Sequence, residues 1–569
     1  MYNLGGNLSN SQFPKMMKRL FDILLLLLIA QTVSAQRLIR SSSRYYVEEQ
    51  ALPQRVEPLL TDVWSQYAPF NNMCPLDAQG NRCVVGCVAT AMTQVMRYWE
   101  WPRRGTGSHE YVDVKGCGQR LSSNFAEHTY DWQNMMDVYR EGEYTSAQGD
   151  AIALLSSDCG IAVNMTYGAE SSGARSIYQP MAMVNHFGYD KGTQMLFRDF
   201  YSLEEITLML KKELAAGRPV LVSGYTNNGG HAFVIDGYDE NDWFHVHLGN
   251  PDNDGDGWTY LPYMVADQPT WYYKDSPENG MNYLQMFTIG LMPSNHVEAM
   301  GVERHNFAFQ YIAAVREKEE ALPVYPRNKV DVTVHDLSNV GWNLLDDSVA
   351  IMLKYGDEVV CPLYTYQRQF ELEEVEDTTY TDTLHLSIPT KVKDGVYTMV
   401  PMYRDNSLEG GKEWREARTS TGTPNYLLAH VQGKEVTLSS DTASYAYLTL
   451  EDYDFPDFMI HNTNPGYSLT LKNHNAEMVG RLYLVLESVD DPSKTFYLQR
   501  QGITMEKDEV STRSFHKSRL YLPRLGCYRL HIRYESNLFA DVMCELPLSE
   551  EIIITVLSGD EIEIASRCP

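Results

Sequence analysis

Two residues in the chain, Cys87 and His231, have the types and surroundings that nucleophilic chemistry requires. Cys87 follows Gly86 and begins a segment whose apolar residues recur at helical spacing. The unpaired amides and the dipole of a helix N-terminus favour a thiolate, the nucleophilic form of cysteine. His231 follows a Gly-rich turn and begins an apolar run typical of a buried strand. Taken singly, each residue could equally be structural, since free cysteines and lone histidines often pack in cores.

Several motifs around these residues occur in a defined order. A cysteine at a helix start with a histidine roughly 130–150 residues downstream is the arrangement of papain-like thiol proteases. The stretches GCVATAMTQVMRYW and GGHAFVIDGYD resemble the streptopain family of secreted bacterial cysteine peptidases, which includes interpain-like proteins. Further matches are WSQYAPFNNMCP, TYDWQNM and CGIAVNMTYGAESSGA, which begin at Trp64, Thr129 and Cys159. Together the motifs span roughly residues 55 to 290, and several ordered motifs are stronger support than one.

The resemblance implies a role for each matching residue. Cys87 matches the family's nucleophile and His231 its general base and later general acid. Gln66, in the WSQ motif, matches the glutamine of the oxyanion hole. Such a site hydrolyses peptide bonds through a Cys-His dyad and a thioester acyl-enzyme, with proteins or peptides as substrates and without a cofactor. A separate protein inhibitor is a further expected partner.

One stretch departs from the family pattern. Where the family carries His-Val-Asn-Trp-Gly-Trp-Gly, this chain has His247 in place of the asparagine and Leu248 in place of the first tryptophan. His247 is therefore the candidate for orienting the catalytic imidazole. The departure leaves one alternative to an active peptidase, a secreted binding or adhesion protein with an impaired peptidase fold. A second alternative is a transglutaminase-like acyl transferase, because a Cys-His site can also serve acyl transfer to an amine.

The pattern of apolar residues predicts how the site is built. Residues 147–157 and 203–216 show helical periodicity, and residues 218–225 are typical of a strand that forms a hairpin with the run after His231. A cysteine on an early helix and a histidine on a later antiparallel sheet are what a papain-like α+β fold requires. We therefore expect a peptidase domain over residues 55–295.

The N-terminus has the features of an export signal. Basic residues precede a leucine run, and Val33-Ser34-Ala35 forms a small-residue cleavage site, which predicts a signal peptide at residues 1–35. A short lead or propeptide segment follows at residues 36–54. The leucine run is too short for an ordinary membrane span, and we expect no transmembrane segment in the mature protein. The protein is therefore expected in the periplasm, at the cell surface or outside the cell.

Composition limits the classes of partner. The chain of 569 residues carries a formal charge of -28, which argues against nucleic acid as a partner because phosphate binding needs basic patches. No metal site is expected either. The acidic loop after Pro251 lacks the glutamate of a calcium-binding EF-hand, since Tyr263 stands at that position, and it is interpreted as a solvated turn. Apart from Cys87, eight cysteines could pair in an oxidising compartment.

Beyond about residue 295 the sequence changes to short β-rich runs separated by Gly, Asn, Asp and Pro turns. The stretches GVYTMVPMY, from Gly395, and GCYRLHIRY, from Gly526, share the spacing of their glycine and two tyrosines. This pattern predicts two all-β immunoglobulin-like sandwich domains, at residues 300–445 and 446–569. These domains could bind substrate or a surface.

Overall fold

A computed structural model describes residues 52–226, 229–253, 255–262, 264, 280–299, 307–315, 323–340, 345–370, 380–404, 414–456, 458–460, 467–515, 525–535, 543–558 and 561–565. The predicted signal peptide and all but the last three residues of the lead segment lie outside the described residues. Within the described part, no helix combines the length and the apolar character needed to cross a membrane.

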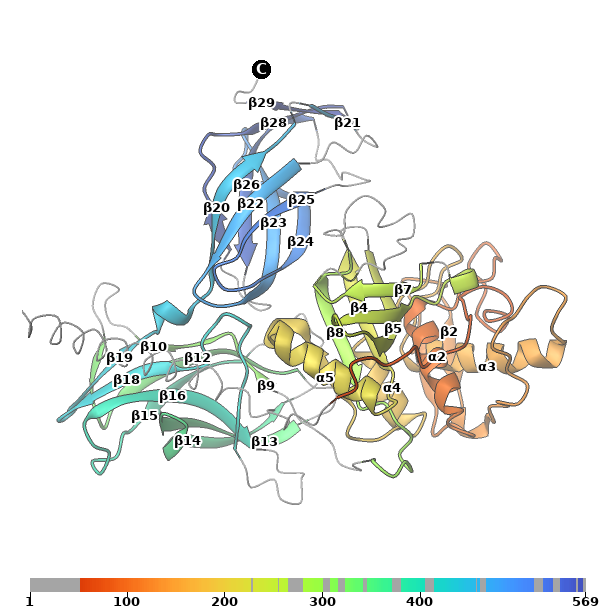
Figure 1. Ribbon diagram of the computed structural model, residues 1–569, viewed down its shortest axis with the longest axis horizontal. Helices are drawn as coiled ribbons and strands as arrows, with labels where there is room; N and C mark the ends of the chain where they lie inside the picture. Colours follow the sequence, from red (N-terminus) through yellow and green to blue (C-terminus); the bar gives the residue numbers. More distant parts are fainter. Residues whose placement is uncertain are drawn as a thin grey trace, which may run out of the picture.

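The α-helices all belong to the first half of the described chain (Figure 1). The three predicted helices are confirmed, and a short helix that the sequence did not indicate lies between the second and third. Two of them begin with a capping box, in which Thr145 or Ser202 satisfies the first backbone amides. The helices are α2 (Cys87–Trp99), α3 (Ser146–Ala162), α4 (Tyr178–Asn185) and α5 (Leu203–Ala215), with short 3-10 turns η1 (Phe125–Glu127), η2 (Arg198–Phe200) and η3 (Pro251–Asn253).

A six-stranded antiparallel sheet completes this first part of the molecule. Its strand order is β3-β8-β4-β5-β6-β7, and the predicted hairpin is its β4-β5 pair. Helix α2 packs against β5, so the cysteine-bearing helix and the histidine-bearing sheet share one core. The strands are β3 (Gln194–Phe197), β4 (Val220–Thr226), β5 (Gly229–Tyr238), β6 (Trp243–His247), β7 (Gly257–Tyr260) and β8 (Tyr283–Ile289), and β1 (His109–Val112) and β2 (Arg120–Ser123) form a separate pair.

The second half of the chain is built from strands, as the sequence predicts. After β8, two sheets with the orders β10-β12-β15 and β11-β19-β18-β16-β13-β14 enclose one core. Two further sheets, β20-β22-β25 and β21-β29-β28-β26-β23-β24, enclose another. Strands β16 and β26, which carry the two similar tyrosine motifs, occupy the same place in their sheets, next to β13 and β23.

The bounds of these strands are β9 (Phe307–Ala308), β10 (Tyr311–Ala314), β11 (Val324–Pro326), β12 (Val330–Asn339), β13 (Leu345–Tyr355), β14 (Glu358–Phe370), β15 (Tyr380–Leu386), β16 (Gly395–Arg404), β17 (Arg415–Glu416), β18 (Leu427–Gln432), β19 (Glu435–Ser439), β20 (Tyr447–Asp454), β21 (Phe458–Ile460), β22 (Tyr467–His474), β23 (Met478–Ser488), β24 (Thr495–Met505), β25 (Val510–Phe515), β26 (Gly526–Glu535), β27 (Cys544–Leu546), β28 (Ile553–Ser558) and β29 (Glu561–Ala565). A 3-10 turn, η5 (Thr442–Ser444), separates the two pairs of sheets.

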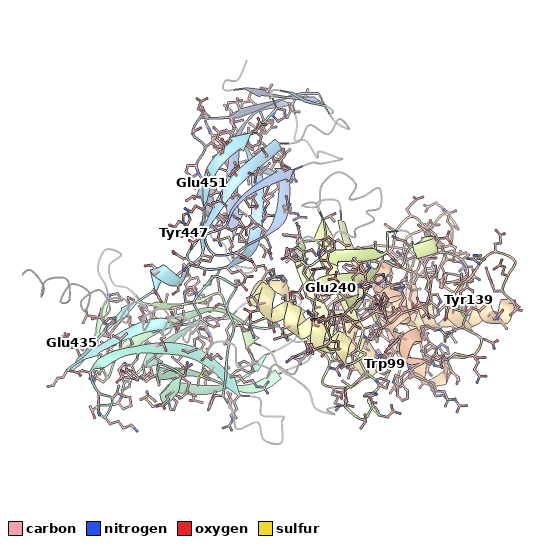
Figure 2. The ribbon with its side chains drawn as sticks, in the orientation of Figure 1. Trp99, Tyr139, Glu240, Glu435, Tyr447 and Glu451 are labelled. Carbon is pink, nitrogen blue, oxygen red and sulfur yellow. The ribbon has the colours of Figure 1, made fainter. Side chains whose placement is uncertain are left out.

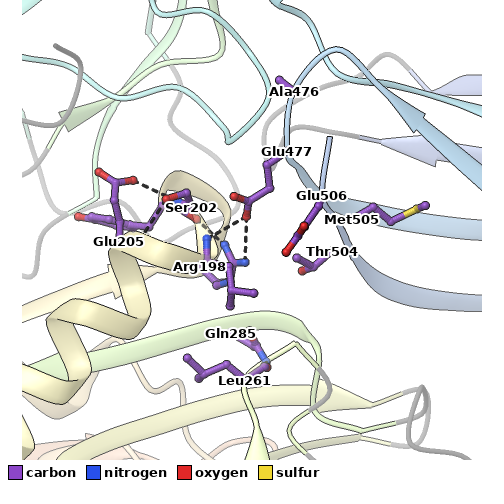
Figure 3. A network of polar contacts seen from close by, with 12 residues as sticks. Arg198, Ser202, Glu205, Leu261, Gln285, Ala476, Glu477, Thr504, Met505 and Glu506 are labelled. Atoms are coloured by element: carbon purple, nitrogen blue, oxygen red, sulfur yellow. Dashed lines mark hydrogen bonds and ion pairs between the residues drawn. The ribbon is translucent and has the colours of Figure 1, made fainter. Parts of the chain in front are cut away.

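The molecule has three parts: the first part with its helices and six-stranded sheet, the middle part formed by β9 to β19, and the last part formed by β20 to β29. The three parts meet around η2. Arg198 is buried, and its guanidinium lies 3.4 Å from the Glu477 carboxylate, which also accepts a 2.8 Å hydrogen bond from the Leu203 amide (Figure 3). The neighbouring Asp199 faces Arg481 at 3.5 Å. Arg418, which lies between β17 and β18, donates a hydrogen bond to the Phe200 carbonyl oxygen at 3.0 Å. One segment of the first part therefore holds both pairs of sheets.

Close backbone contact reinforces this junction. A side chain at Gly502 on β24 would place its Cβ only 1.8 Å from the Asn282 carbonyl oxygen, just before β8. Tyr447 and Glu451, by contrast, lie on the side of the last part that faces away from the helices in Figure 2. The last pair of sheets thus contacts the first part through one edge and leaves the opposite edge exposed.

Fewer cysteines form disulfides in the described part of the chain than the sequence allows. Cys527 is disulfide-bonded. Seven of the described cysteines carry free thiols, and five of them are buried: Cys74, Cys83, Cys117, Cys159 and Cys361. Burial raises the pKa of Cys159 and Cys74, so these thiols stay protonated and pack as small apolar groups. Of the eight cysteines that could pair, six therefore carry free thiols in the described part of the chain.

Candidate active site

Cys87 is the first residue of α2, and the glycine before it is required by the local geometry. Gly86 has φ +91°, a backbone conformation that residues with side chains rarely adopt. A Cβ at this position would also lie 2.6 Å from the Met165 sulfur. The turn leaves Cys87 half-buried, while the next residues of the helix are fully buried. The sulfur therefore sits at the helix N-terminus at the edge of the core.

His231 reaches Cys87 from the sheet. It lies near the start of β5, paired with Gly224 of β4, and it is also half-buried. Because α2 packs on β5, the two side chains meet and share a hydrogen bond. The structure thus brings together the two residues that the sequence selected as nucleophile and base.

The two groups shift each other's protonation in opposite directions. Burial alone would raise the pKa of the Cys87 thiol, but the positive charge and hydrogen bond of His231 outweigh it and lower that pKa. Amides of Ala232 and Val88 also favour the thiolate. Burial would lower the pKa of His231, yet Cys87 raises it. The arrangement therefore favours a thiolate beside an imidazolium.

The far side of the His231 ring is held by backbone. His231 Nε2 lies 2.7 Å from the carbonyl oxygen of Leu248. A carbonyl can only accept, so Nε2 carries a proton and Nδ1 is left to face the sulfur. Leu248 is in turn fixed, because its amide donates to Asp256 Oδ1 at 2.7 Å. The orientation of the imidazole thus depends on main-chain atoms one residue beyond β6.

His247, the residue expected to orient His231, makes other contacts. Its Nδ1 lies 3.2 Å from Asp256 Oδ2 and its Nε2 lies 3.9 Å from Asp236 Oδ2. Burial lowers the pKa of His247, so its ring is neutral near pH 7. The expectation for His247 is therefore corrected, since the Leu248 carbonyl occupies the orienting position. In the acidic loop, Asp252 is exposed, as expected of a solvated turn, whereas the Asp256 side chain is only 9% exposed.

Gln66 lies beside the cysteine segment. Its backbone carbonyl accepts a 3.0 Å hydrogen bond from Val85, two residues before Cys87, and the residue is partly exposed. Trp64 anchors the same segment, because it is fully buried and its indole donates to the Met136 carbonyl at 2.8 Å. The loop that carries Gln66 is thus fixed next to the start of α2.

The ion pair gives a testable pH dependence. Alkylation of Cys87 by iodoacetamide is expected to begin at lower pH than for an ordinary thiol, because the thiolate forms once pH exceeds the lowered pKa. Mass spectrometry of digested protein measures the rate at each pH, with exposed Cys544 as the internal reference. In His231→Gln the onset should move up toward the usual cysteine range, about pH 8.5. The same profile with and without His231 would contradict the ion pair.

A cysteine at a helix start, hydrogen-bonded to a histidine on an antiparallel sheet, defines a papain-like cysteine peptidase site. The comparisons agree with this class. The sequence profile of the Peptidase C10 family matches residues 64–258. Streptopain of Streptococcus pyogenes is 31% identical over 200 residues, which are 33% of this chain and 50% of streptopain. The chain belongs to this family, the streptopain-type cysteine peptidases.

Two other relatives cover different lengths of the chain. The thiol protease/hemagglutinin PrtT of Porphyromonas gingivalis is 28% identical over 409 residues, 69% of this chain and 43% of PrtT, so the likeness continues past the first part. The solved structure of interpain A from Prevotella intermedia has 32% identity and a TM-score of 0.38, covering 43% of this chain and 98% of interpain A. The chain spans half or less of the length of the curated relatives it matches.

Proposed function

We propose that the protein is an exported cysteine endopeptidase with Cys87 as nucleophile and His231 as general base and acid. The observation that carries this proposal is the hydrogen bond between the two side chains, with the pKa of Cys87 lowered and that of His231 raised. Family membership supports the same reaction. Resemblance to the streptopain family of secreted bacterial cysteine peptidases also supports export.

The geometry supports a two-step reaction. The Cys87 thiolate attacks the peptide carbonyl carbon, and the His231 imidazolium gives its Nδ1 proton to the leaving amine as the C–N bond breaks. This leaves a thioester on Cys87 and a neutral imidazole. The imidazole then removes a proton from water as the water oxygen attacks the thioester, the C–S bond breaks, and the carboxylic acid leaves with the Cys87 thiolate and the His231 imidazolium restored. Throughout, the Leu248 carbonyl keeps the proton on Nε2 and the ring in place.

Gln66 is proposed as the side-chain donor of the oxyanion hole. Its loop is fixed next to Cys87, and a donor placed there would stabilise the negative oxygen that forms during attack. Gln66→Ala is expected to lower kcat by about 10²–10³-fold, and Gln66→Glu, which cannot donate when ionised, by a similar factor. Steady-state kinetics on a peptide substrate measures both. An unchanged kcat in both variants would remove Gln66 from the site.

The impaired-enzyme alternative is not favoured by the structure. It rested on the changes at His247 and Leu248, yet His231 is held by a backbone carbonyl that any residue at position 248 supplies. The Leu248 side chain is itself buried, at 4% exposed. Acyl transfer to an amine would use the same thioester, and product analysis with an added amine separates it from hydrolysis.

We also propose that the two β parts are immunoglobulin-like sandwich domains at residues 300–445 and 446–569. Paired antiparallel sheets around separate cores support this assignment. A role in binding substrate or a surface is supported by the exposed edge of the last part, where Tyr447 is 43% exposed and stacks on His474. The name of PrtT includes the word hemagglutinin, which is consistent with a binding role. A protein inhibitor that restrains the peptidase is proposed on family resemblance alone.

The test of the function is casein hydrolysis under reducing conditions by protein that starts at Gln36. The wild type is expected to cleave casein at internal bonds, and Cys87→Ala is expected to be inactive although it folds as the wild type does. Folded wild-type protein that cleaves neither casein nor denatured protein substrates would overturn the proposal.

A further inference from the structure

A compact group of metal-ligating side chains lies outside the Cys87–His231 pair. Asp236, His245 and His247 each offer one ligand atom, and these atoms all lie within 4.8 Å of one another. Asp236 is fully buried and His247 is 4% exposed. We propose that Asp236, His245 and His247 form a binding site for a divalent transition-metal ion, with Zn²⁺ as the representative ion. This site was not expected from the sequence, and it does not depend on the proposed peptidase activity.

The backbone is shaped to bring these side chains together. His245 and His247 are two residues apart on β6, so they point to the same face of the sheet. Asp236 comes from β5, where the pairing with β6 shifts register between Ile235 and Gly237. Asp236 is the extra residue of this bulge, and it shares a face with Val234, which is paired with His247. The pairing of β5 with β6 thus places the carboxylate beside both imidazoles.

The distances suit coordination. His245 Nδ1 lies 2.7 Å from Asp236 Oδ1, and His247 Nε2 lies 3.9 Å from Asp236 Oδ2. In a tetrahedral zinc site with bonds of about 2.0–2.1 Å, ligand atoms lie about 3.3 Å apart. The two observed separations fall on either side of that value, so shifts below 1 Å would admit the ion. Two imidazoles and one carboxylate leave the fourth position for water.

His247 provides the second, independent indication. Its Nδ1 is buried and makes no hydrogen bond within the described part of the chain, although it lies 3.2 Å from Asp256 Oδ2. Metal-bound histidines usually donate their other ring nitrogen to a carboxylate. A small rotation toward a metal at Nε2 could align Nδ1–H with Asp256 and satisfy both nitrogens. A bound cation would also balance the buried Asp236 carboxylate.

The proposed metal site lies next to Leu248, the residue whose carbonyl holds the His231 ring. Leu248 follows His247 directly, its carbonyl receives His231 Nε2–H, and its amide is held by Asp256. A metal on His247 would therefore fix the end of β6. Trp258, the cross-strand neighbour of His245 on β7, packs against it with ring centroids 5.3 Å apart. The ion would thus have this aromatic ring beside it.

The experiment uses the full chain with Cys87→Ala, which prevents zinc from binding the active-site thiolate. Zinc is titrated against a chromophoric chelator, and thermal unfolding is followed with Zn²⁺ and with EDTA. We expect one bound equivalent and a higher unfolding midpoint with zinc, with both effects lost in His247→Asn and His245→Gln. His385→Asn is the matched control and should leave both effects unchanged, because His385 lies 2.7 Å from Asp331 in an exposed pair that has no third ligand among the residues the structure describes.

Zinc-edge X-ray absorption on the Cys87→Ala protein identifies the ligands without depending on whether the histidine variants fold. Two imidazole nitrogens with oxygen ligands are expected. Sulfur ligands would place the zinc on the free cysteines and overturn the proposal. A titration that finds no bound zinc would also overturn the proposal. So would one zinc equivalent that is still bound by folded His247→Asn.

Discussion

His231→Gln is expected to lower kcat/KM for peptide hydrolysis by about 10⁴-fold, because one ring supplies two functions. It stabilises the Cys87 thiolate before attack, and it transfers the proton to the leaving amine afterwards. Glutamine keeps hydrogen-bonding atoms at this position but cannot take up the proton. Steady-state kinetics with a fluorogenic peptide measures the loss.

A matched control separates this effect from a general disturbance of histidines. His109 is a partly buried histidine on β1, outside the sheet that carries His231, and its Nε2 lies 2.7 Å from Asn164 Oδ1. His109→Gln should keep kcat/KM close to that of the wild type. If His231→Gln lost less than about tenfold, a role as general acid and base would be contradicted.

Arg198→Met is expected to lower the free energy of unfolding by about 3–5 kcal/mol, the usual cost of leaving a buried charge without its partner. Arg198 is 2% exposed, and it joins the first part of the molecule to Glu477 of the last part (Figure 3). Burial already raises the pKa of Glu477, and the Arg198 charge opposes that shift. Without Arg198 the Glu477 carboxylate would lose its main counter-charge. Urea denaturation, with limited proteolysis to detect separation of the parts, measures the effect.

A double-mutant cycle tests whether the two charges act on each other. Arg198→Met with Glu477→Gln should be less destabilised than the sum of the two single variants. Arg55→Met is the matched control, since Arg55 forms an exposed pair with Glu57 at 2.6 Å and its replacement should leave the urea midpoint unchanged. Simple additivity of the two junction variants would contradict the coupling.

The parts of the site that follow local patterns could be predicted from the sequence. Helical periodicity after Cys87 predicted that α2 starts there, and the Gly-rich turn before an apolar run predicted that His231 lies at the start of a strand, which is β5. The role of His247 could not be predicted, because the group that orients His231 is the Leu248 carbonyl, and every residue has a carbonyl. The contact of Asp236 with His245 and His247 could not be predicted either, because the register of β5 against β6, with its bulge, leaves no periodic signal.

Contacts between residues far apart in the sequence could not be predicted either. Arg198 and Glu477 are far apart in the sequence, and each alone resembles a surface charge. Their burial becomes evident only when the last pair of sheets packs on η2 and β8. In the same way, the strands of the β parts were predicted from alternation and turns, whereas their common attachment to the peptidase part was not.

Labelling with an epoxide inhibitor that reacts with activated thiols tests the central claim most directly. Among the described residues seven cysteines have free thiols, so the position of the label is informative. Intact-mass and peptide-mass analysis should find one label per chain, on Cys87, with casein hydrolysis falling in proportion to the labelled fraction. Folded wild-type protein with no label on Cys87, or hydrolysis that persists in Cys87→Ala, would contradict the account.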